Sequence, residues 1–290
     1  MSRSAFNTGL GTRRAVDVRA YPPRPKRSTH VLREELEGKL AALQKDYAEL
    51  HTEIFEAAQV HRRLCAPRLV RHGNFEIASE IFAVRHLPGD FFTVEEKHDG
   101  VILALGDICG KGLAAGMWTT HLVGLVGARV AVASEPEQMV AGVNRDLCLT
   151  ESVVPLASLF LAKLNPITGL VKYCSAGHPP ALLLRANGEL EFLSEGGLLL
   201  GVVPAASYVS GSFELGAGDV LLIYSDGITE SRNSAGEEFG YARLEAQLRS
   251  AQAGAGDAML FSVLGAVQDF AAACPLIDDM SVAIVRRDSC

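Results

Sequence analysis

The sequence has little of what marks several common protein classes. Its 290 residues include six cysteines without a single Cys-x-x-Cys pair, one tryptophan and only 7% aromatic residues. Cysteines scattered in this way indicate neither a zinc knuckle nor a disulfide framework, and are typical of reduced thiols in the cytoplasm. Charged residues make up 21% of the chain and hydrophobic residues 48%, which excludes a disordered or fibrous protein.

The chain also has no clear membrane-spanning segment. The apolar run at residues 113–128 contains two threonines and a histidine, and it is shorter than the roughly 18 residues of a membrane span. Residues 1–12 contain no apolar stretch of the kind that a secretory signal needs. We therefore expect a cytoplasmic protein without a membrane span.

Basic residues are fewer than acidic residues over most of the chain. The sequence has 27 Lys and Arg against 34 Asp and Glu, a formal net charge of −7 at pH 7. Because binding to nucleic acid usually relies on a basic surface, we expect no nucleic acid partner. Residues 1–30 are the exception, since they are basic and interrupted by prolines, a composition typical of a disordered tail.

Residues 31–66 carry a helical pattern. Apolar side chains recur in steps of four and three residues, with charged residues between them and no proline before Pro67. The inward positions are Leu36, Leu40, Leu43, Tyr47, Leu50, Ile54, Ala57, His61 and Leu64. We expect either a parallel coiled-coil stalk that forms a homodimer and relays a signal, or an amphipathic helix that packs on its own domain.

Residues 67–290 are expected to form one domain of strands and helices. Apolar runs separated by turn signals such as Asn187-Gly188 predict strands, many of them antiparallel. The expected strands are 75–84, 101–106, 156–164, 169–175, 181–185, 189–193, 207–214, 219–225 and 280–286. The expected helices are 113–133, 136–149, 241–251 and 257–273. A capping box between Ser134 and Glu137 would begin the second helix. Helix pairs between runs of hairpin strands favour an α+β fold.

Aspartates stand at four edges of apolar strands. Asp107 and Asp226 each end an apolar run, Asp90 lies in a short glycine-containing segment, and Asp278-Asp279 directly precedes the last strand. Carboxylates at the rim of a buried sheet are desolvated, and several that converge repel one another unless a cation neutralises them. Mg²⁺ or Mn²⁺ suits such oxygen ligands, whereas zinc would need His or Cys at short spacing. Each aspartate alone is more typical of an ordinary turn than of a ligand, so only the set indicates a metal site.

Five short motifs follow one another in a characteristic order and at a characteristic spacing. They are Gly-Asp-Phe-Phe at 89–92, Leu-Gly-Asp-Ile-Cys-Gly-Lys-Gly at 105–112, Ala-Gly-His-Pro-Pro at 176–180, Tyr-Ser-Asp-Gly-Ile-Thr-Glu at 224–230 and Asp-Asp-Met-Ser at 278–281. On these motifs, residues 57–287 resemble the SpoIIE/RsbU-like bacterial branch of the metal-dependent, protein phosphatase 2C-type (PPM) serine/threonine phosphatases. The resemblance implies a four-layer α-β-β-α sandwich, in which two antiparallel sheets are flanked by helix pairs. It also implies a site for two Mn²⁺ or Mg²⁺ ions at one end of the sandwich.

The resemblance assigns roles to single residues. Asp107 matches the aspartate that bridges both ions, and the backbone carbonyl of Ile108 completes a ligand set. In the late acidic pair, Asp278 matches a ligand, and Asp279 is a neighbour that orients it. The implied metal-site residues are Asp90, Asp107, Ile108, Asp226, Asp278 and Asp279. Asp107 and Asp226 would be the catalytic pair, because they hold ions that activate water for attack on phosphorus.

The sequence departs from the family pattern at four positions. Pro88 replaces a glycine, and Thr93 stands where an aspartate often follows Asp90. Lys111 replaces a common histidine, and its amine would either bind substrate phosphate or neutralise the acidic rim. His178 stands where the eukaryotic branch has an aspartate tied to a third ion. Its imidazole would either act on the substrate, as a general acid or a binding group, or serve as a structural hydrogen-bonding group.

Two functions remain open at this point. The first is a metal-dependent phosphoserine or phosphothreonine protein phosphatase. The resemblance implies phosphorylated anti-sigma-factor antagonists of a partner-switching pathway as its substrates, and an activating protein would dock on residues 31–66. The second is a regulatory binding module that has kept the fold and lost turnover, which the departures at Pro88 and Thr93 favour. Metal-dependent release of phosphate distinguishes the two.

Overall fold

The computed structural model describes residues 29–149, 155–272 and 274–287. Most of the basic tail that the sequence predicts at 1–30 therefore lies outside the described residues. The chain divides into two compact units, residues 1–50 and 51–290. None of the helices in the described part of the chain has the length and hydropathy needed to cross a membrane.

The helix predicted at residues 31–66 is present as α1 (Thr29–Leu64). Ion pairs between residues four positions apart stabilise the helix along its exposed surface. One of them joins Arg33 and Glu37 at 2.7 Å. Within residues 29–50, the apolar positions of the pattern are exposed, and the side chain of Leu43 is 65% accessible. An apolar stripe on an exposed helix is a surface on which another helix can pack.

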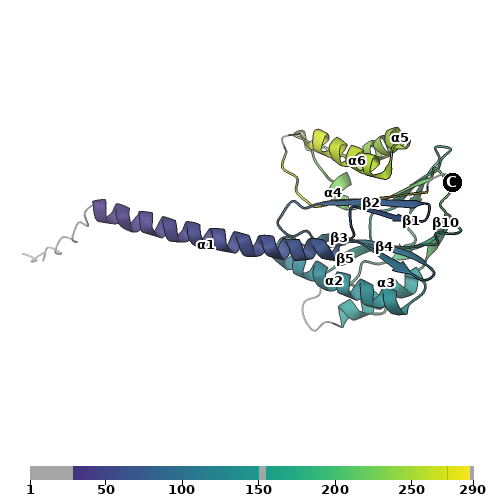
Figure 1. Ribbon diagram of the computed structural model, residues 1–290, viewed down its shortest axis with the longest axis horizontal. Helices are drawn as coiled ribbons and strands as arrows, with labels where there is room; N and C mark the ends of the chain where they lie inside the picture. Colours follow the sequence, from purple (N-terminus) through teal and green to yellow (C-terminus); the bar gives the residue numbers. More distant parts are fainter. Residues whose placement is uncertain (1–28, 150–154, 273, 288–290) are drawn as a thin grey trace, which may run out of the picture. The chain divides into compact units, whose positions relative to one another are not determined.

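Two antiparallel sheets form the centre of the 51–290 unit (Figure 1). The first sheet runs in the order β1 (Leu69–His72), β2 (Phe75–Phe82), β12 (Met280–Arg287), β11 (Val220–Tyr224), β7 (Ala181–Leu184) and β8 (Leu190–Leu193). The second runs in the order β10 (Gly211–Glu214), β6 (Leu170–Ala176), β5 (Ala157–Leu164), β4 (Gly100–Ile108) and β3 (Asp90–Lys97), and β9 (Gly196–Gly197) pairs with β6. The short β9 is the one parallel partner among these pairs.

Helix pairs cover the outer faces of both sheets, which completes the four-layer α-β-β-α sandwich (Figure 1). The pair on the second sheet is α2 (Leu113–Val132) and α3 (Pro136–Cys148), and the pair on the first is α5 (Gly240–Ala251) and α6 (Gly256–Ala271). The one-turn helix α4 (Asp226–Thr229) follows β11 directly. This arrangement confirms the α+β fold class predicted from the sequence pattern and the layer order that the family resemblance implies.

The strand β4 shows how the sequence specifies the layers. Its side chains are buried on both faces, so the strand reads as a continuous apolar run without alternation. Val101, Leu103 and Leu105 join the apolar layer between the sheets, and Ile102, Ala104 and Ile108 join the layer under α2 and α3. A third apolar layer lies between the first sheet and α5 and α6. Each large apolar side chain buried in this way contributes about 1.5–3 kcal/mol to folding.

Several elements differ from the sequence prediction. The strands β1, β3 and β9 were not predicted, and of the expected strand at 207–214 only β10 forms. The charged second half of β3, Glu95-Glu96-Lys97, masks the strand pattern, whereas its pairing with β4 holds it in place. The expected capping box is wrong: α3 begins after Glu135 without a side-chain cap, and Glu137 instead accepts a hydrogen bond from the hydroxyl of Ser210.

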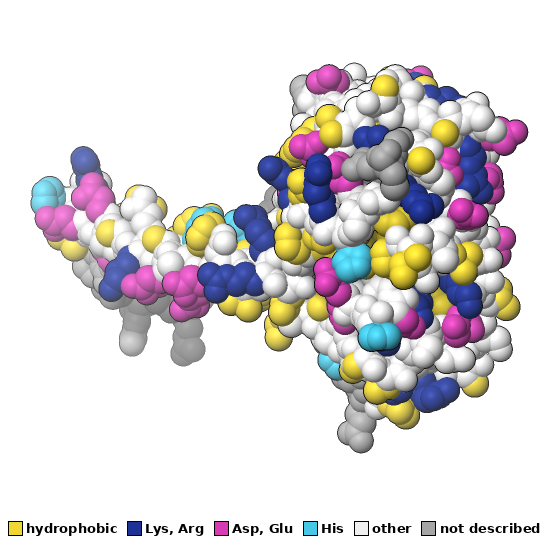
Figure 2. Space-filling view, turned by 45° about the vertical axis from the view of Figure 1, so that its right-hand side comes forward, with side chains coloured by type: hydrophobic (Ala, Val, Ile, Leu, Met, Phe, Trp, Pro, Cys, Tyr) yellow, Lys and Arg dark blue, Asp and Glu magenta, His cyan; other side chains and the backbone are white. Residues whose placement is uncertain are grey.

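Charge on the surface is mixed. Figure 2 shows Lys and Arg side chains interspersed with Asp and Glu on the face that it draws. Such interspersion on that face differs from the continuous basic surface that proteins use to bind a nucleic acid backbone.

Candidate metal centre

Four strand ends bring the predicted aspartates to one end of the sandwich. Asp90 begins β3 and lies directly opposite Asp107, near the end of β4, in the antiparallel pair. In the other sheet, β11 leads directly into α4, which begins at Asp226, and the antiparallel β12 begins just after Asp278-Asp279. Ser281 connects the two sheets, because its hydroxyl donates a hydrogen bond of 2.5 Å to Asp90 Oδ2. The structure thus brings all the predicted aspartates together.

Asp90 forms the buried base of the site. Its side chain is only 2% exposed. Burial and the negative charge of Asp107 raise its pKa well above the ordinary value, and hydrogen bonds from Ser281 and Ser225 partly offset this rise. The carboxyl group is therefore held close to Asp107 by neighbouring hydroxyls, while its charged form is disfavoured.

Asp107 lies at the centre of the acidic set. Burial raises its pKa to about 7, and the charges of Asp226, Asp278 and Asp279 act in the same direction. The pKa of Asp226 is raised by burial and by the charge of Asp278. Because burial and neighbouring carboxylates raise the pKa of Asp107 and Asp226, ionising the whole site is costly, and a cation would relieve that cost.

Lys111 supplies one positive charge at the rim. Its Nζ lies 2.6 Å from Asp278 Oδ2 and 2.8 Å from the carbonyl oxygen of Ile277. The two side chains of this ion pair are 37% and 46% exposed, so solvent weakens the attraction. Of the two roles that the sequence left open for Lys111, neutralisation of the acidic rim is the one seen in this arrangement.

Asp279 supports the segment that leads to Asp90. Its Oδ1 accepts the backbone N–H of Val84 and its Oδ2 accepts that of Gly89, both at 2.8 Å. The buried hydroxyl of Thr119 on α2 donates to the carbonyl oxygen of Gly89, also at 2.8 Å. Both carboxylate oxygens of Asp279 are thus used in fixing residues 84–89, immediately before Asp90.

His178 lies below the site rather than at its surface. It is 5% exposed, its Nδ1 is 2.7 Å from the hydroxyl oxygen of Ser158, and Ser158 pairs with Asp107 across β4 and β5. Burial lowers the pKa of His178 to about 3, so the imidazole is neutral at physiological pH. This placement favours the structural role over general-acid catalysis or substrate binding, because the ring is buried away from solvent.

Three hydroxyl groups that position the acidic residues were not among the predicted site residues, those of Ser225, Ser281 and Thr119. Ser225 and Ser281 belong to the quoted motifs, and their nearness to aspartates was the available signal. Nothing in the residue type marked Thr119, because its contact with Gly89 joins segments 30 residues apart.

The donor chemistry fits a hard cation, whereas the side-chain arrangement is not yet that of a metal cage. Within the described residues, no group of three His, Cys, Asp or Glu side chains is placed to hold a metal ion. The contacts above give the reason: Asp278 is bound to Lys111, and Asp279 is bound to the backbone. Two candidate ligand oxygens do face the same space beside Gly89, because Asp107 Oδ1 and the carbonyl oxygen of Ile108 both lie 3.3 Å from where a Cβ on Gly89 would stand. Carboxylate and carbonyl oxygens are the ligands that Mg²⁺ and Mn²⁺ prefer.

Comparisons with known proteins agree with this architecture. Residues 97–288 match the family model described as Stage II sporulation protein E (SpoIIE). The chain is 24% identical over 242 residues to phosphoserine phosphatase RsbU of Bacillus subtilis, covering 82% of this chain and 71% of RsbU.

Solved structures show the same fold. The SiaA-PP2C domain of Pseudomonas aeruginosa matches with a TM-score of 0.74 at 17% identity, covering 86% of this chain and all of that domain. The catalytic domain of the serine/threonine protein phosphatase PstP, solved with two manganese ions, matches with a TM-score of 0.53 at 17% identity, covering 74% of this chain and 99% of that one. Likeness at this level of identity concerns the fold.

The buried imidazole predicts a specific pH dependence of stability. Folding holds the pKa of His178 at about 3, whereas an unfolded chain has a histidine pKa of about 6.5, so the unfolded state binds the proton at intermediate pH. His178 therefore adds no pH dependence above about pH 7. Below about pH 6.5 it lowers the free energy of unfolding, by up to about 1.4 kcal/mol per pH unit.

We expect His178→Gln to lose this component. Urea unfolding at about pH 7.5 and about pH 4.5 should show a smaller loss of stability on acidification for the variant than for the wild type. The comparison removes the contributions of the carboxylates, since both proteins carry them. Equal losses in the two proteins would show that His178 is not held neutral by the fold.

Proposed function

The chain belongs to the SpoIIE family, and from that membership we propose that it is a metal-dependent protein phosphatase that hydrolyses phosphoserine or phosphothreonine. The main support for this proposal is that Asp90, Asp107, Asp226 and Asp278 lie together at one end of the sandwich. Burial and mutual repulsion raise the pKa of Asp90, Asp107 and Asp226. RsbU is named a phosphoserine phosphatase, and PstP holds two manganese ions, which supports the reaction class and the metal dependence.

Each acidic residue has a proposed task. Asp107 and Asp226, with Asp278 and the carbonyl oxygen of Ile108, would hold two Mn²⁺ or Mg²⁺ ions, which supply charge neutralisation and activation of water when bound. Asp90, which lies opposite Asp107 on the buried side, is the further residue proposed for the metal site. Asp279 positions the segment before Asp90 through the backbone of Val84 and Gly89.

Lys111 combines the two roles that the sequence left open. In the present arrangement its ammonium group neutralises Asp278. A cation held by Asp278 would displace this contact and leave the Lys111 amine beside the acidic centre. There the amine can bind a phosphate oxygen of the substrate as a point charge.

The aspartates provide the first test. We expect an Asp107→Ala, Asp226→Ala double variant to lose at least about 1000-fold in kcat/KM, because phosphoryl transfer depends on positioning and on neutralising oxygen charge. The measurement is release of phosphate from a phosphoserine protein in the presence of Mn²⁺. Asp269→Ala, on the exposed side of α6, is the matched control and should retain wild-type activity.

Equal rates of phosphate release for the wild type and the double variant would contradict the proposed phosphatase activity. In that case the chain would be the regulatory binding module that the departures at Pro88 and Thr93 favoured.

The ion pair of Lys111 provides a second test. Because the Lys111 amine and a cation compete for Asp278, Lys111→Gln should lower the Mn²⁺ concentration for half-maximal activity by a few-fold, a modest change for a pair that is partly exposed. If the freed amine also binds phosphate, the same variant raises KM for the phosphoprotein.

Lys163→Gln is the control for this experiment, because the Lys163 amine pairs with Asp99 instead of the acidic centre. A Mn²⁺ requirement that is the same in Lys111→Gln and the wild type would contradict the competition.

The substrate and partners follow from the resemblance. We propose a phosphorylated anti-sigma-factor antagonist of a partner-switching pathway as the substrate, in the cytoplasm. An activating protein would dock on residues 31–66, where helix α1 offers exposed apolar side chains.

The same stripe on α1 supports a homodimer through a coiled coil. Leu40 and Leu43 are 55% and 65% exposed, and both lie on the stripe at heptad spacing. We expect the wild type to sediment as a dimer, and a Leu40→Asp, Leu43→Asp double variant to sediment as a monomer, since buried charges oppose the helix pairing. Gln44→Asp, which adds a charge beside the stripe, should remain a dimer. A wild type that sediments as a monomer would contradict the proposed coiled-coil dimer.

A further inference from the structure

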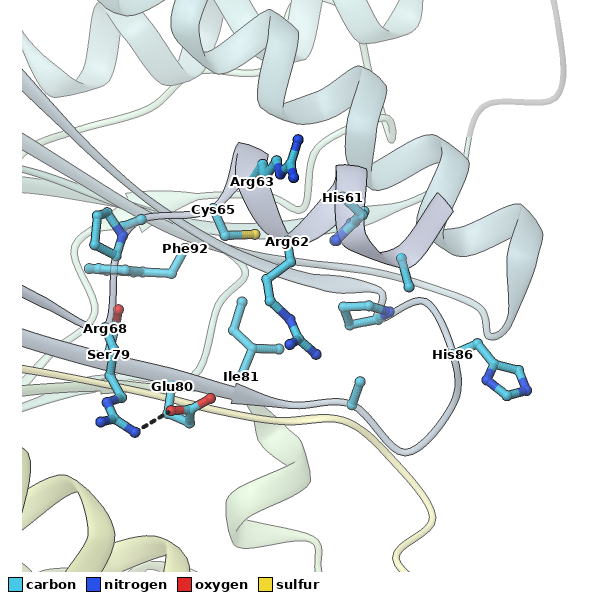
Figure 3. A pocket seen from close by; sticks show the side chains of 15 residues that line it. His61, Arg62, Arg63, Cys65, Arg68, Ser79, Glu80, Ile81, His86 and Phe92 are labelled. Carbon is cyan, nitrogen blue, oxygen red and sulfur yellow. Dashed lines mark ion pairs between the residues drawn. The ribbon is translucent and has the colours of Figure 1, made fainter. Parts of the chain in front are cut away.

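A cavity of about 450 Å³ lies within the 51–290 unit, where helix α1 ends. Its lining comes from the end of α1 and the following residues up to Arg68, from the second half of β2, and from the segment that runs into β3 (Figure 3). Cavities of about 300–1,000 Å³ are typical of sites for small molecules. Neither the acidic centre nor the apolar stripe of residues 29–50 contributes to this lining.

Apolar side chains form the walls of the cavity. Ala66, Ile81 and Phe92 line it, and Figure 3 shows Phe92 and Ile81 on the side of the cavity toward the sheets. Ala66 is fixed there, because its backbone N–H donates to the carbonyl oxygen of Phe92 at 2.7 Å. Such walls suit the apolar body of a ligand.

One polar atom in the lining is without a partner. His61 is 4% exposed, and among the described residues its Nε2 has no hydrogen-bond partner. Figure 3 shows the imidazole directed from the helix toward the cavity. A buried polar atom without a partner costs free energy, so a ligand atom that bonds to His61 Nε2 would recover it.

The charge of the lining is positive. Three arginines and one glutamate line the cavity, and the glutamate, Glu80, pairs with Arg68 at a distance of 3.9 Å. Figure 3 shows Arg62 reaching from the helix end across the cavity toward Ile81, whereas Arg63 points away from it. A guanidinium group in this position matches an anionic oxygen group on a ligand.

We propose that this cavity is a binding site for a small organic anion. The apolar body of the ligand packs against Ile81 and Phe92, its anionic group meets Arg62, and a polar atom bonds to His61 Nε2. The proposal does not depend on phosphatase activity, because no residue of the acidic centre takes part in it.

The position of the cavity gives such a ligand two sets of contacts. On one side is the end of α1, and on the other are His86 and Pro88, which lie in the segment that Asp279 holds through Val84 and Gly89. That segment ends at Asp90. A bound anion would therefore brace the end of α1 against the segment that carries the first aspartate of the acidic centre.

Anilinonaphthalene sulfonate, an aromatic anion that fluoresces in apolar sites, is a suitable probe for the full chain. We expect saturable binding at one site, with about tenfold weaker affinity in Arg62→Gln, since a charge-assisted contact is lost. Arg63→Gln removes the same charge from the neighbouring residue, which points away from the cavity, and should bind as the wild type does. Circular dichroism checks that both variants are folded.

Cys65 reports on the location of the probe. Its thiol lines the cavity, whereas Cys109 is exposed elsewhere. Saturating probe should slow alkylation of Cys65 by N-ethylmaleimide at least about threefold and leave Cys109 unchanged, as peptide mass spectrometry can measure, because thiol reactivity requires access. Absence of binding, equal affinity in Arg62→Gln and the wild type, or an unprotected Cys65 would each overturn the proposal.

Discussion

The burial of several carboxylates that repel one another, at one end of the sandwich, is the physical constraint that governs the candidate site. Asp107 lies opposite the fully buried Asp90 and within the field of Asp226 and Asp278, and burial removes the water that would otherwise screen them. A buried carboxylate without a partner of opposite charge would be strongly destabilising there. The ammonium group of Lys111 balances one charge at the rim, and the divalent cations proposed to bind here would neutralise the remaining carboxylates.

The sandwich keeps these groups together through its topology. Antiparallel pairing places the start of β3 beside the end of β4, and the end of β11 beside the start of β12. Three apolar layers pack the two sheets against each other and against the helices. Small hydroxyl groups complete the fit, since Ser281 joins the sheets at Asp90 and Thr119 fixes the backbone of Gly89.

The sequence predicted what local patterns can encode. Apolar runs marked most of the strands, and aspartates at their ends marked the site, because a run buried on both faces and a carboxylate at its edge are visible in one segment. Contacts between distant segments were not visible, such as Lys111 with Asp278 or Asp279 with the backbone of Val84. The strand β3 was hidden by its charged second half, whose place is set by pairing with β4. The cavity at the end of α1 was hidden for the same reason, as three segments enclose it.

We propose that the acidic centre binds divalent cations in exchange for the Lys111–Asp278 ion pair. A crystal structure of the protein soaked in Mn²⁺, analysed by anomalous scattering, tests it most directly. We expect two anomalous peaks among Asp107, Asp226 and Asp278, with the Lys111 amine moved away from Asp278. Crystals saturated with Mn²⁺ that show no peak there, and an intact Lys111–Asp278 contact, would contradict it.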